Sequence, residues 1–494
     1  MRRRVHPLRF LKLASLTALV GIPLAVACGE DATVPDPTAP ETGAGEDSGS
    51  DSPVAADTSP TEDGGGEDAA DVTCPDVAPN DAEGIFVTPT GMNTGTCGTR
   101  AAPCKTISFS VTRAGAAFRT KVFVAAGTYV EKVTLAAGVE VIGGWEVTGT
   151  TWKRACVTPE ELVVVRAPAL QNITVEAHDL NGEARLSLLH IESKAAVNLV
   201  AGESVYGVVA TGTTTTLVLT DVNVAMGNAA SGVSGPKGDA GAPGPASCAP
   251  GPAVVAEAGA PGAQGTGAPV GTYDPNAQYV PGTAMAGGVG TVGENGNAGG
   301  AAPPCLPCGT CVSDAMLMTC NFVLTPGQTS CGAAGKNGCG GGPGDPGGPA
   351  IGGGSDIGVF AWDATVTIKG GSVKSGDAGN GGTGGPGGAG GAGSAGVAGT
   401  MGDICTTSCL AAGAACTPVM TKGAGGTAGG TGALGGTGGS GGGGGGGSSF
   451  ATYQGGQGVV SVMGGTTLSH GKPGKGGPPD AGAGASGVAA DHVP

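Results

Sequence analysis

Short apolar runs, each bounded by glycine or a small polar residue, recur between residues 84 and 225 of the chain. The first three are Val122–Val124, Val133–Leu135 and Val139–Ile142. They are rich in β-branched side chains, which favours short strands. Helices of useful length do not fit between corners that lie so close together. The pattern therefore predicts a β-solenoid, in which each coil buries its inward face against the next coil.

Further runs of the same kind continue towards residue 219. The expected strands are residues 162–165, 173–175, 186–188, 197–199, 208–209 and 217–219. Residues 106–118 have a helical pattern and are expected to include at least one helical turn. We interpret this turn as a cap, because an open solenoid end exposes both the core and the strand edges.

The same pattern returns at long range in the chain. Gly207–Ala210 precedes residues 217–229, and Gly358–Ala361 precedes residues 366–378. A looser third copy is expected in Gly458-Val459 and the residues up to 472. Each copy alternates apolar and polar positions and then ends in a glycine-rich stretch. We interpret the copies as successive coils of one solenoid, separated by long excursions.

The composition of these excursions argues against a conventional core. Glycine accounts for 103 of the 494 residues, and only 13% of the residues are charged, whereas an ordinary domain has about 7% glycine and about 25% charged residues. A flexible, solvated arm is the favoured interpretation. The alternative is a bundle of extended helices with three residues per turn, packed through their glycine faces. Collagen is disfavoured, because residues 235–246 supply only four triplets.

The start of the chain has the features of an export signal. Arginines and a lysine precede the apolar stretch Leu13–Val26, which is too short to span a bilayer. The stretch ends in Leu24–Cys28, which resembles a bacterial lipobox and implies lipidation of Cys28. The alternative is cleavage by an ordinary signal peptidase, which would give a secreted protein without a lipid. Gly29 is not the Asp that retains enteric lipoproteins at the inner membrane, so the resemblance implies the outer membrane.

An acidic segment follows the signal. Thirteen carboxylates and no Lys or Arg lie between Gly29 and Thr73, and the formal net charge of the chain is −16. Such a segment cannot bury enough apolar area to offset the cost of ordering, so we expect a disordered tether. Nucleic-acid binding is disfavoured, because phosphate contacts need a basic face.

Together these patterns predict an all-β chain built from a β-helix with glycine-rich, low-complexity insertions. The expected divisions are a signal peptide at 1–28, an acidic tether at 29–73, a β-helix core at 74–228, a Gly/Cys-rich insertion at 229–356, a coil at 357–376, a Gly-rich insertion at 377–449, a coil at 450–470 and a Gly-rich tail at 471–494.

Residues 84–225 carry a family resemblance. The matching residues include Gly98-Thr99, Pro103, Thr106-Ile107, Gly127–Tyr129 and Glu131, followed by Gly143–Trp145 and Trp152–Arg154. They resemble bacterial right-handed parallel β-helix proteins of the pectin-lyase-like superfamily, including large secreted myxobacterial ones. Cys104 departs from the family, which usually has an aromatic there, and a disulfide to Cys97 could replace that packing. The excursions resemble the polyglycine arms proposed for mycobacterial PGRS-like surface proteins.

Fifteen cysteines are present, and fourteen remain to form disulfides if Cys28 is lipidated. An exported chain favours disulfides, which limit the freedom of segments that lack a core. Cys305, Cys308 and Cys311 also have the spacing of zinc ligands, although none of the five histidines lies near them in the sequence. Disulfides are the favoured interpretation, and the sequence does not give the pairing.

No group of residues in the sequence stands out as catalytic or as a cofactor or metal site. Carboxylates and basic residues are scattered singly over the core, at Glu176, Asp179, Glu183, Glu192, Lys194 and Asp221. Lyases and glycosidases need such groups clustered. The histidines at 178 and 190 are expected to be exposed side chains. Trp145, Trp152 and Trp362 could stack on sugar rings, but core packing is favoured.

The sequence therefore predicts a non-catalytic, lipid-anchored protein of the outer membrane or cell surface with a structural, adhesive or display role and no cofactor. The expected partners are the membrane, through the lipid, and extracellular polysaccharide or neighbouring cell surfaces. The alternative is a β-helix that binds or cleaves carbohydrate. A row of aromatics along one face would support binding, and a tight carboxylate cluster would support cleavage.

Overall fold

The structure is a computed structural model, and it describes residues 78–156, 158–251, 255–274, 279–314, 319–406, 420–478 and 482–494. The signal peptide, the lipidation of Cys28 and the acidic tether at 29–73, all predicted from the sequence, fall outside the described residues. Within them, no helix is both long and apolar enough to cross a membrane.

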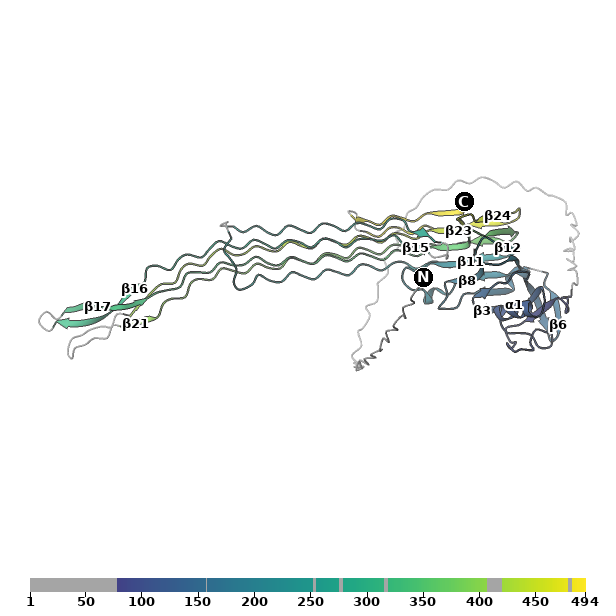
Figure 1. The fold of residues 1–494 in the computed structure, drawn as a ribbon, viewed down its shortest axis with the longest axis horizontal. Coiled ribbons are helices and arrows are strands. Elements are labelled where there is room, and N and C mark those ends of the chain that lie inside the picture. Colours follow the sequence, from purple (N-terminus) through teal and green to yellow (C-terminus); the bar gives the residue numbers. More distant parts are fainter. Residues whose placement is uncertain are drawn as a thin grey trace, which may run out of the picture. The chain divides into compact units, whose positions relative to one another are not determined.

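Three parallel sheets form the body of the protein, and the chain passes from one sheet to the next in a repeating order (Figure 1). The first sheet contains β1 (Gly84–Val87), β2 (Lys121–Ala125), β5 (Glu140–Thr148), β9 (Gly182–Ser187), β12 (Thr215–Thr220), β19 (Thr365–Lys369) and β24 (Val459–Val462). The second contains β3 (Gly127–Val130), β7 (Val163–Arg166), β10 (His190–Glu192), β13 (Asn223–Ala225), β20 (Ser372–Lys374) and β25 (Thr467–Ser469). The third contains β4 (Val133–Thr134), β8 (Ile173–His178), β11 (Val205–Thr211), β18 (Asp356–Trp362), β23 (Ser449–Gly455) and β26 (Ala489–Val493). The predicted fold class, a parallel β-helix, is confirmed.

Apolar side chains stack in register along the inside of the coils. In the first sheet, Val122 pairs with Val141, which pairs with Leu186. The same ladder continues through Leu219 and Ile368, and all five side chains are buried. The long-range repeat is also confirmed, because residues 208–210 pair with residues 359–361 in parallel register. Each coil therefore buries the inward face that it cannot bury alone.

A helix covers the N-terminal end of the solenoid, as predicted. Helix α1 (Ile107–Ala116) buries Ile107, Val111 and Ala114 in the main core. Its N-terminus is capped from a distant part of the chain, since the Glu131 carboxylate accepts hydrogen bonds from the backbone N–H groups of Ile107 (2.8 Å) and Ser108 (2.9 Å). A carboxylate suits this position because the first N–H groups of a helix lack partners within the helix.

Three details differ from the sequence predictions. Residues 197–199 are not a strand; most of them lie in the 3₁₀ turn η2 (Ala196–Asn198), in the connection between β10 and β11, where Val197 is 91% exposed. Gly458-Val459 is not the third copy of the third-sheet strand. That copy is β23, whose sequence SFATYQG lacks the Gly-Val pair, and Val459 begins β24 of the first sheet. The expected Gly-rich tail ends in a further strand, β26, which pairs with β23.

The long excursions all leave the solenoid at one corner, between the second and third sheets. Each excursion follows a strand of the second sheet (β13, β20 or β25) and precedes the next strand of the third sheet (β18, β23 or β26). They consist of extended segments, which we number I (227–248), II (259–269), III (282–300), IV (332–354), V (375–402), VI (423–448), VII (470–478) and VIII (482–488). We call them together the glycine bundle. Figure 1 shows the longer segments running side by side towards the hairpin strands β16 (Leu306–Asp314) and β17 (Thr319–Ser330).

Hydrogen bonds join these segments at every third residue. The N–H groups of Gly232, Gly235 and Gly238 in segment I donate to carbonyl oxygens of segment V, at 2.7–2.9 Å. Segment IV donates to segment VI with the same period, from Gly338 through Gly353. A period of three is that of an extended, polyproline-like helix. The flexible arm, our favoured interpretation from the sequence, is therefore wrong for the described residues, and the alternative of packed three-residue-per-turn helices is observed.

Segment VI lies at the centre of the bundle, with hydrogen bonds to segments II, III, IV, V, VII and VIII. Its sequence follows this packing. Leu434, Thr437 and Ser440 occupy one of its three faces where that face is open, and glycines replace them at Gly443 and Gly446, whose N–H groups donate to segment VIII. The residues from 441 to 450 are all buried. A run of consecutive glycines is thus required where neighbours cover every face.

Disulfides form within the solenoid and, separately, within the excursions. Cys97 pairs with Cys104, as predicted where Cys104 departs from the family pattern. Within the excursions, Cys248 pairs with Cys339, and Cys305 pairs with Cys331 across the base of the β16–β17 hairpin. Cys156 and Cys308 are also disulfide-bonded. Because the sulfurs of Cys305 and Cys308 are used in this way, the zinc alternative at Cys305, Cys308 and Cys311 is excluded for this state of the protein.

Candidate functional site

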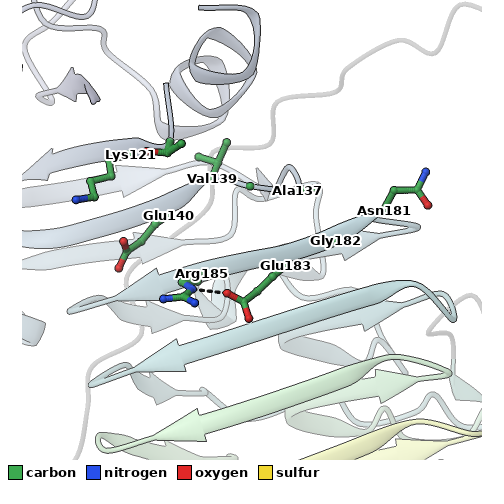
Figure 2. Close-up of a pocket in the computed structure, with 10 residues that line it drawn as sticks. Lys121, Ala137, Val139, Glu140, Asn181, Gly182, Glu183 and Arg185 are labelled. Carbon is green, nitrogen blue, oxygen red and sulfur yellow. Dashed lines mark hydrogen bonds and ion pairs between the residues drawn. The ribbon is translucent and has the colours of Figure 1, made fainter. Parts of the chain in front are cut away.

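A shallow, charged depression lies on the outer face of the first sheet, where β2, β5 and β9 run side by side (Figure 2). Its volume is about 530 Å³, and its lining residues are Thr120, Lys121, Ala137, Gly138, Val139, Glu140, Asn181, Gly182, Glu183 and Arg185. Strand alternation explains the arrangement, because the residues that flank the inward-facing valines point outwards.

The outward charges alternate in sign across the strands. Lys121 is in register with Glu140, and Glu140 is in register with Arg185. Lys121 forms an ion pair with Glu83, 2.8 Å away, and lowers the pKa of that carboxyl. Arg185 bonds to Glu183, and this contact raises the pKa of the guanidinium. Opposite charges in adjacent strands stabilise the sheet, so the row has a structural explanation that needs no ligand.

Glu140 and Glu183 are the two carboxylates of the depression. The Glu140 carboxylate accepts a hydrogen bond from the Ser187 hydroxyl (3.0 Å), and Glu183 is held by Arg185 (Figure 2). Each acid has its own partner. Within the described residues no group of three or more His, Cys, Asp or Glu side chains is arranged to hold a metal ion. The depression offers polar contacts to a hydroxylated or charged ligand. In the sequence, the one feature that pointed to it was a charged residue beside each apolar run.

The other predicted carboxylates and Lys194 are placed apart from one another. Glu176 forms an ion pair with Lys132 (2.6 Å), and Glu192 pairs with Arg166 (2.5 Å). Lys194 is buried, and its ammonium lies 2.6 Å from the Glu203 carboxylate. These ion pairs each join neighbouring parts of the coils. They explain the charged side chains as structural, and they bring no two of the candidates together.

Asp179 and Asp221 occupy solenoid corners. Their φ angles are +48° and +51°, in the left-handed region that Asp tolerates better than most residues. In the next coils Gly212 stacks on Asp179 and Gly370 stacks on Asp221, again with positive φ. The two aspartates were candidates for chemistry, and their positions give them the role of turn residues.

Both predicted histidines lie in local contacts at the surface of the solenoid. His178 is 3.0 Å from Asp179 and shares a hydrogen bond with the Thr211 hydroxyl (2.6 Å), with its side chain 58% exposed. His190 lies 3.4 Å from Glu192. The expectation that the histidines are exposed is confirmed for His178, whereas His190 is only partly exposed.

The tryptophans pack against other side chains of the protein, as the sequence analysis favoured over stacking on sugar rings. Trp145 and Trp152 are each 2% exposed and form a small core with Phe86 and Phe123 on the outer face of the first sheet. This core is closed by β6 (Thr151–Arg154), which runs antiparallel to β5. Trp362 is partly buried and stacks on Phe360, with ring centroids 6.1 Å apart.

A row of aromatics, the pattern that would support carbohydrate binding, is present along the third sheet. Phe360 is in register with Tyr453, and the rings stack at 5.3 Å. However, the hairpin of β14 (Thr272–Tyr273) and β15 (Tyr279–Val280) lies over this row. Tyr273 is 4.6 Å from Tyr453 between ring centroids, and the Tyr279 N–H donates to the Tyr206 hydroxyl (3.0 Å). Phe360 is fully buried as a result, so this chain fills most of the row itself.

The disulfides bear on the compartment in which the protein is found. Three complete pairs are described, and two further cysteines are disulfide-bonded. Such cross-links form and persist in oxidising compartments, which indicates a location outside the cytoplasm. No family model matches the chain, and no curated protein or solved structure matches it either.

Proposed function

We propose that the protein is a non-catalytic, lipid-anchored surface protein that displays the hairpins at the end of its glycine bundle. The bundle is the observation that carries this proposal. Its segments are joined by a hydrogen bond at every third residue, so it behaves as a stiff spacer instead of a flexible linker. At about 3.1 Å per residue, segment V from Gly376 to Gly402 is about 80 Å long.

The chemistry of the bundle end fits a display role. The Cys305–Cys331 disulfide holds the base of β16–β17, and a second hairpin, β21 (Ile404–Thr406) with β22 (Met420–Lys422), follows segment V. The cross-linked β16–β17 hairpin resists unfolding outside the cell. Under this proposal Cys28 carries the lipid, residues 29–73 are the tether, and the hairpins contact extracellular polysaccharide or a neighbouring cell surface.

The proposal is tested in the native host with three strains. One carries the wild-type chain, one carries Cys28→Ser, and one replaces both hairpin regions, 305–331 and 404–422, with short Gly-Ser linkers. We expect Cys28→Ser to move the protein from the membrane fraction to the medium. The hairpin replacement should stay on the surface and lower attachment. Unchanged attachment and envelope integrity, with the hairpins replaced and with the whole gene deleted, would refute the display role.

The charged depression supports a second candidate, a carbohydrate-binding or carbohydrate-cleaving surface. Lys121 and Arg185 lie on either side of Glu140 in the depression, and Glu140 and Glu183 offer acceptors for hydroxyl groups. We expect a double variant with Lys121→Ala and Arg185→Ala to bind acidic polysaccharide about tenfold more weakly, whereas exposed Lys374→Ala on the second sheet should not. Release of product from a polysaccharide panel with calcium would favour cleavage over the display role.

A further inference from the structure

The glycine bundle contains a groove between segments V and VI that one short segment fills only in part. Next to the solenoid, segment VII lies in this groove. The N–H groups of Gly381 and Gly384 in segment V donate to the carbonyls of Lys475 (2.9 Å) and Pro478 (2.8 Å). In return, segment VII donates to segment VI, from Gly474 to Gly447 (3.0 Å) and from Gly477 to Gly444 (2.8 Å).

The same groove continues beyond the end of segment VII. On segment V the donors of this face beyond Gly387 are the N–H groups of Gly390, Gly393 and Gly396, and Gly390 and Gly393 are half-buried. None of these groups has a hydrogen-bond partner among the described residues. The groove closes further along, where Gly399 and Gly402 donate directly to segment VI.

Segment VI provides the opposite wall of this unfilled stretch. The carbonyl oxygens of Gly438, Gly435 and Gly432 continue the series that begins with Gly447 and Gly444, and among the described residues they also accept no hydrogen bond. By analogy with segment VII, one wall therefore offers donors to an occupant and the other wall offers acceptors, each with a period of three residues. The stretch from Gly390 to Gly396 is about 20 Å long at about 3.1 Å per residue.

We propose that this groove binds an extended polypeptide from a partner, with glycine at every third residue and three residues per turn. The argument for this occupant is continuity, because segment VII already binds in the same groove with that geometry. Backbone donors and acceptors that lie half-buried without partners favour a ligand that pairs with both walls.

The glycine requirement follows from the contacts of segment VII. A Cβ atom at Gly474 would lie 1.9 Å from the carbonyl oxygen of Gly379, and at Gly477 it would lie 1.8 Å from that of Gly382. No side chain fits at these two positions. Lys472, Lys475 and Pro478 are exposed and point outwards, whereas Gly476 lies against Gly484 of segment VIII.

Segment V also favours proline directly after each glycine of the ligand. Near the solenoid, the side chains of Asp377 and Asn380 accept hydrogen bonds from the N–H groups of Lys472 (2.7 Å) and Lys475 (2.8 Å). Ala389 and Ala392 occupy the same face further along and have no side-chain acceptor. A ligand residue without an N–H group loses nothing there, and proline also preforms the extended helix.

The first experiment tests whether the groove is open. Amide hydrogen exchange on the mature protein should show slow exchange at Gly381 and Gly384 and faster exchange at Gly390 and Gly393. Protected amides at Gly390 and Gly393 in the free protein would overturn the proposal, because the groove would then already be closed.

The second experiment measures binding by fluorescence anisotropy with a labelled (Gly-Pro-Lys)5 peptide and an (Ala-Pro-Lys)5 control. We expect the glycine peptide to bind at least tenfold more tightly and to slow exchange at Gly390 and Gly393. Ala389→Trp and Ala392→Trp should block binding, whereas Ala240→Trp on the exposed face of segment I should not. Equal binding of the two peptides would reduce the effect to charge attraction and overturn the proposal, as would no binding of either.

Discussion

The carboxylate of Asp356 accepts a hydrogen bond from the backbone N–H of Gly376, 3.0 Å away, at the corner where the glycine bundle joins the solenoid. Asp356 is fully buried, and its second oxygen has no hydrogen-bond partner. In the next coil, the Ser449 hydroxyl accepts a hydrogen bond from Gly471 in the same way (3.0 Å). A neutral acceptor would therefore satisfy the geometry, and the acid introduces a proton-dependent element at this junction.

The buried acid predicts a pH dependence of stability. Burial raises the pKa of the Asp356 carboxyl well above its usual value, whereas the unfolded chain has a pKa of about 3.9. The stability that this group contributes is fully present below about pH 4 and is lost as pH rises through the folded-state pKa. Asp356→Asn keeps one acceptor oxygen and does not ionise. Its melting temperature minus that of the wild type should increase from pH 4 to pH 9. A difference that stays constant with pH would contradict this.

The central segment of the bundle predicts a sharp contrast between two positions one turn apart. A Cβ atom at Gly443 would lie 1.8 Å from the carbonyl oxygen of Gly477, whereas Ser440 already carries a side chain on the same face. Gly443→Ala should lower the free energy of unfolding by about 1–3 kcal/mol through overpacking, and Ser440→Ala should change it by less than about 0.5 kcal/mol. Urea denaturation measures both, and equal effects would mean that segment VIII does not pack there.

The sequence was most informative about the solenoid, because its signal is local. Short β-branched runs at Val122–Val124 and Val139–Ile142 specify strands whatever their partners are, and the stacking of coils follows from the repeat. The third-sheet copy at β23 was missed because residues 449–455 lack the Gly-Val pair of the earlier copies. Its inward positions are filled instead by small side chains such as Ala451, which is buried.

The order of the glycine bundle could not be read with the same certainty. One extended segment has no hydrogen bonds of its own, so its order depends entirely on neighbours that lie far away in the sequence. The pairing of Gly235 with Thr383 is an example. The charged depression was missed for a related reason, since Lys121, Glu140 and Arg185 meet only through strand register. The glycine run at 441–447 was the one local signal of a fully surrounded segment.

The cap on helix α1 predicts a measurable loss of stability. Glu131 accepts hydrogen bonds from two N–H groups at the start of the helix, and removal of such a cap typically costs about 0.5–2 kcal/mol. Glu131→Ala should therefore lower the free energy of unfolding by about 1–2 kcal/mol, and Glu131→Gln should lose less because it keeps an acceptor oxygen. Glu146→Ala, at an exposed position of β5, is the control. If all three variants denature at the wild-type urea concentration, the carboxylate does not stabilise the helix.

Two disulfides that close loops of different length allow a last prediction. Cys248 and Cys339 are 91 residues apart and join segments I and IV, whereas Cys97 and Cys104 are 7 residues apart. If the disulfides act by limiting the unfolded chain, loss of the long link costs about 4.6 kcal/mol and loss of the short one about 2.4 kcal/mol. The paired serine variants should therefore differ in stability by about 2 kcal/mol in urea denaturation, with intact mass after alkylation showing that the other disulfides persist. A larger loss for Cys97 and Cys104 would mean that packing at the solenoid end, where both side chains are buried, outweighs loop closure.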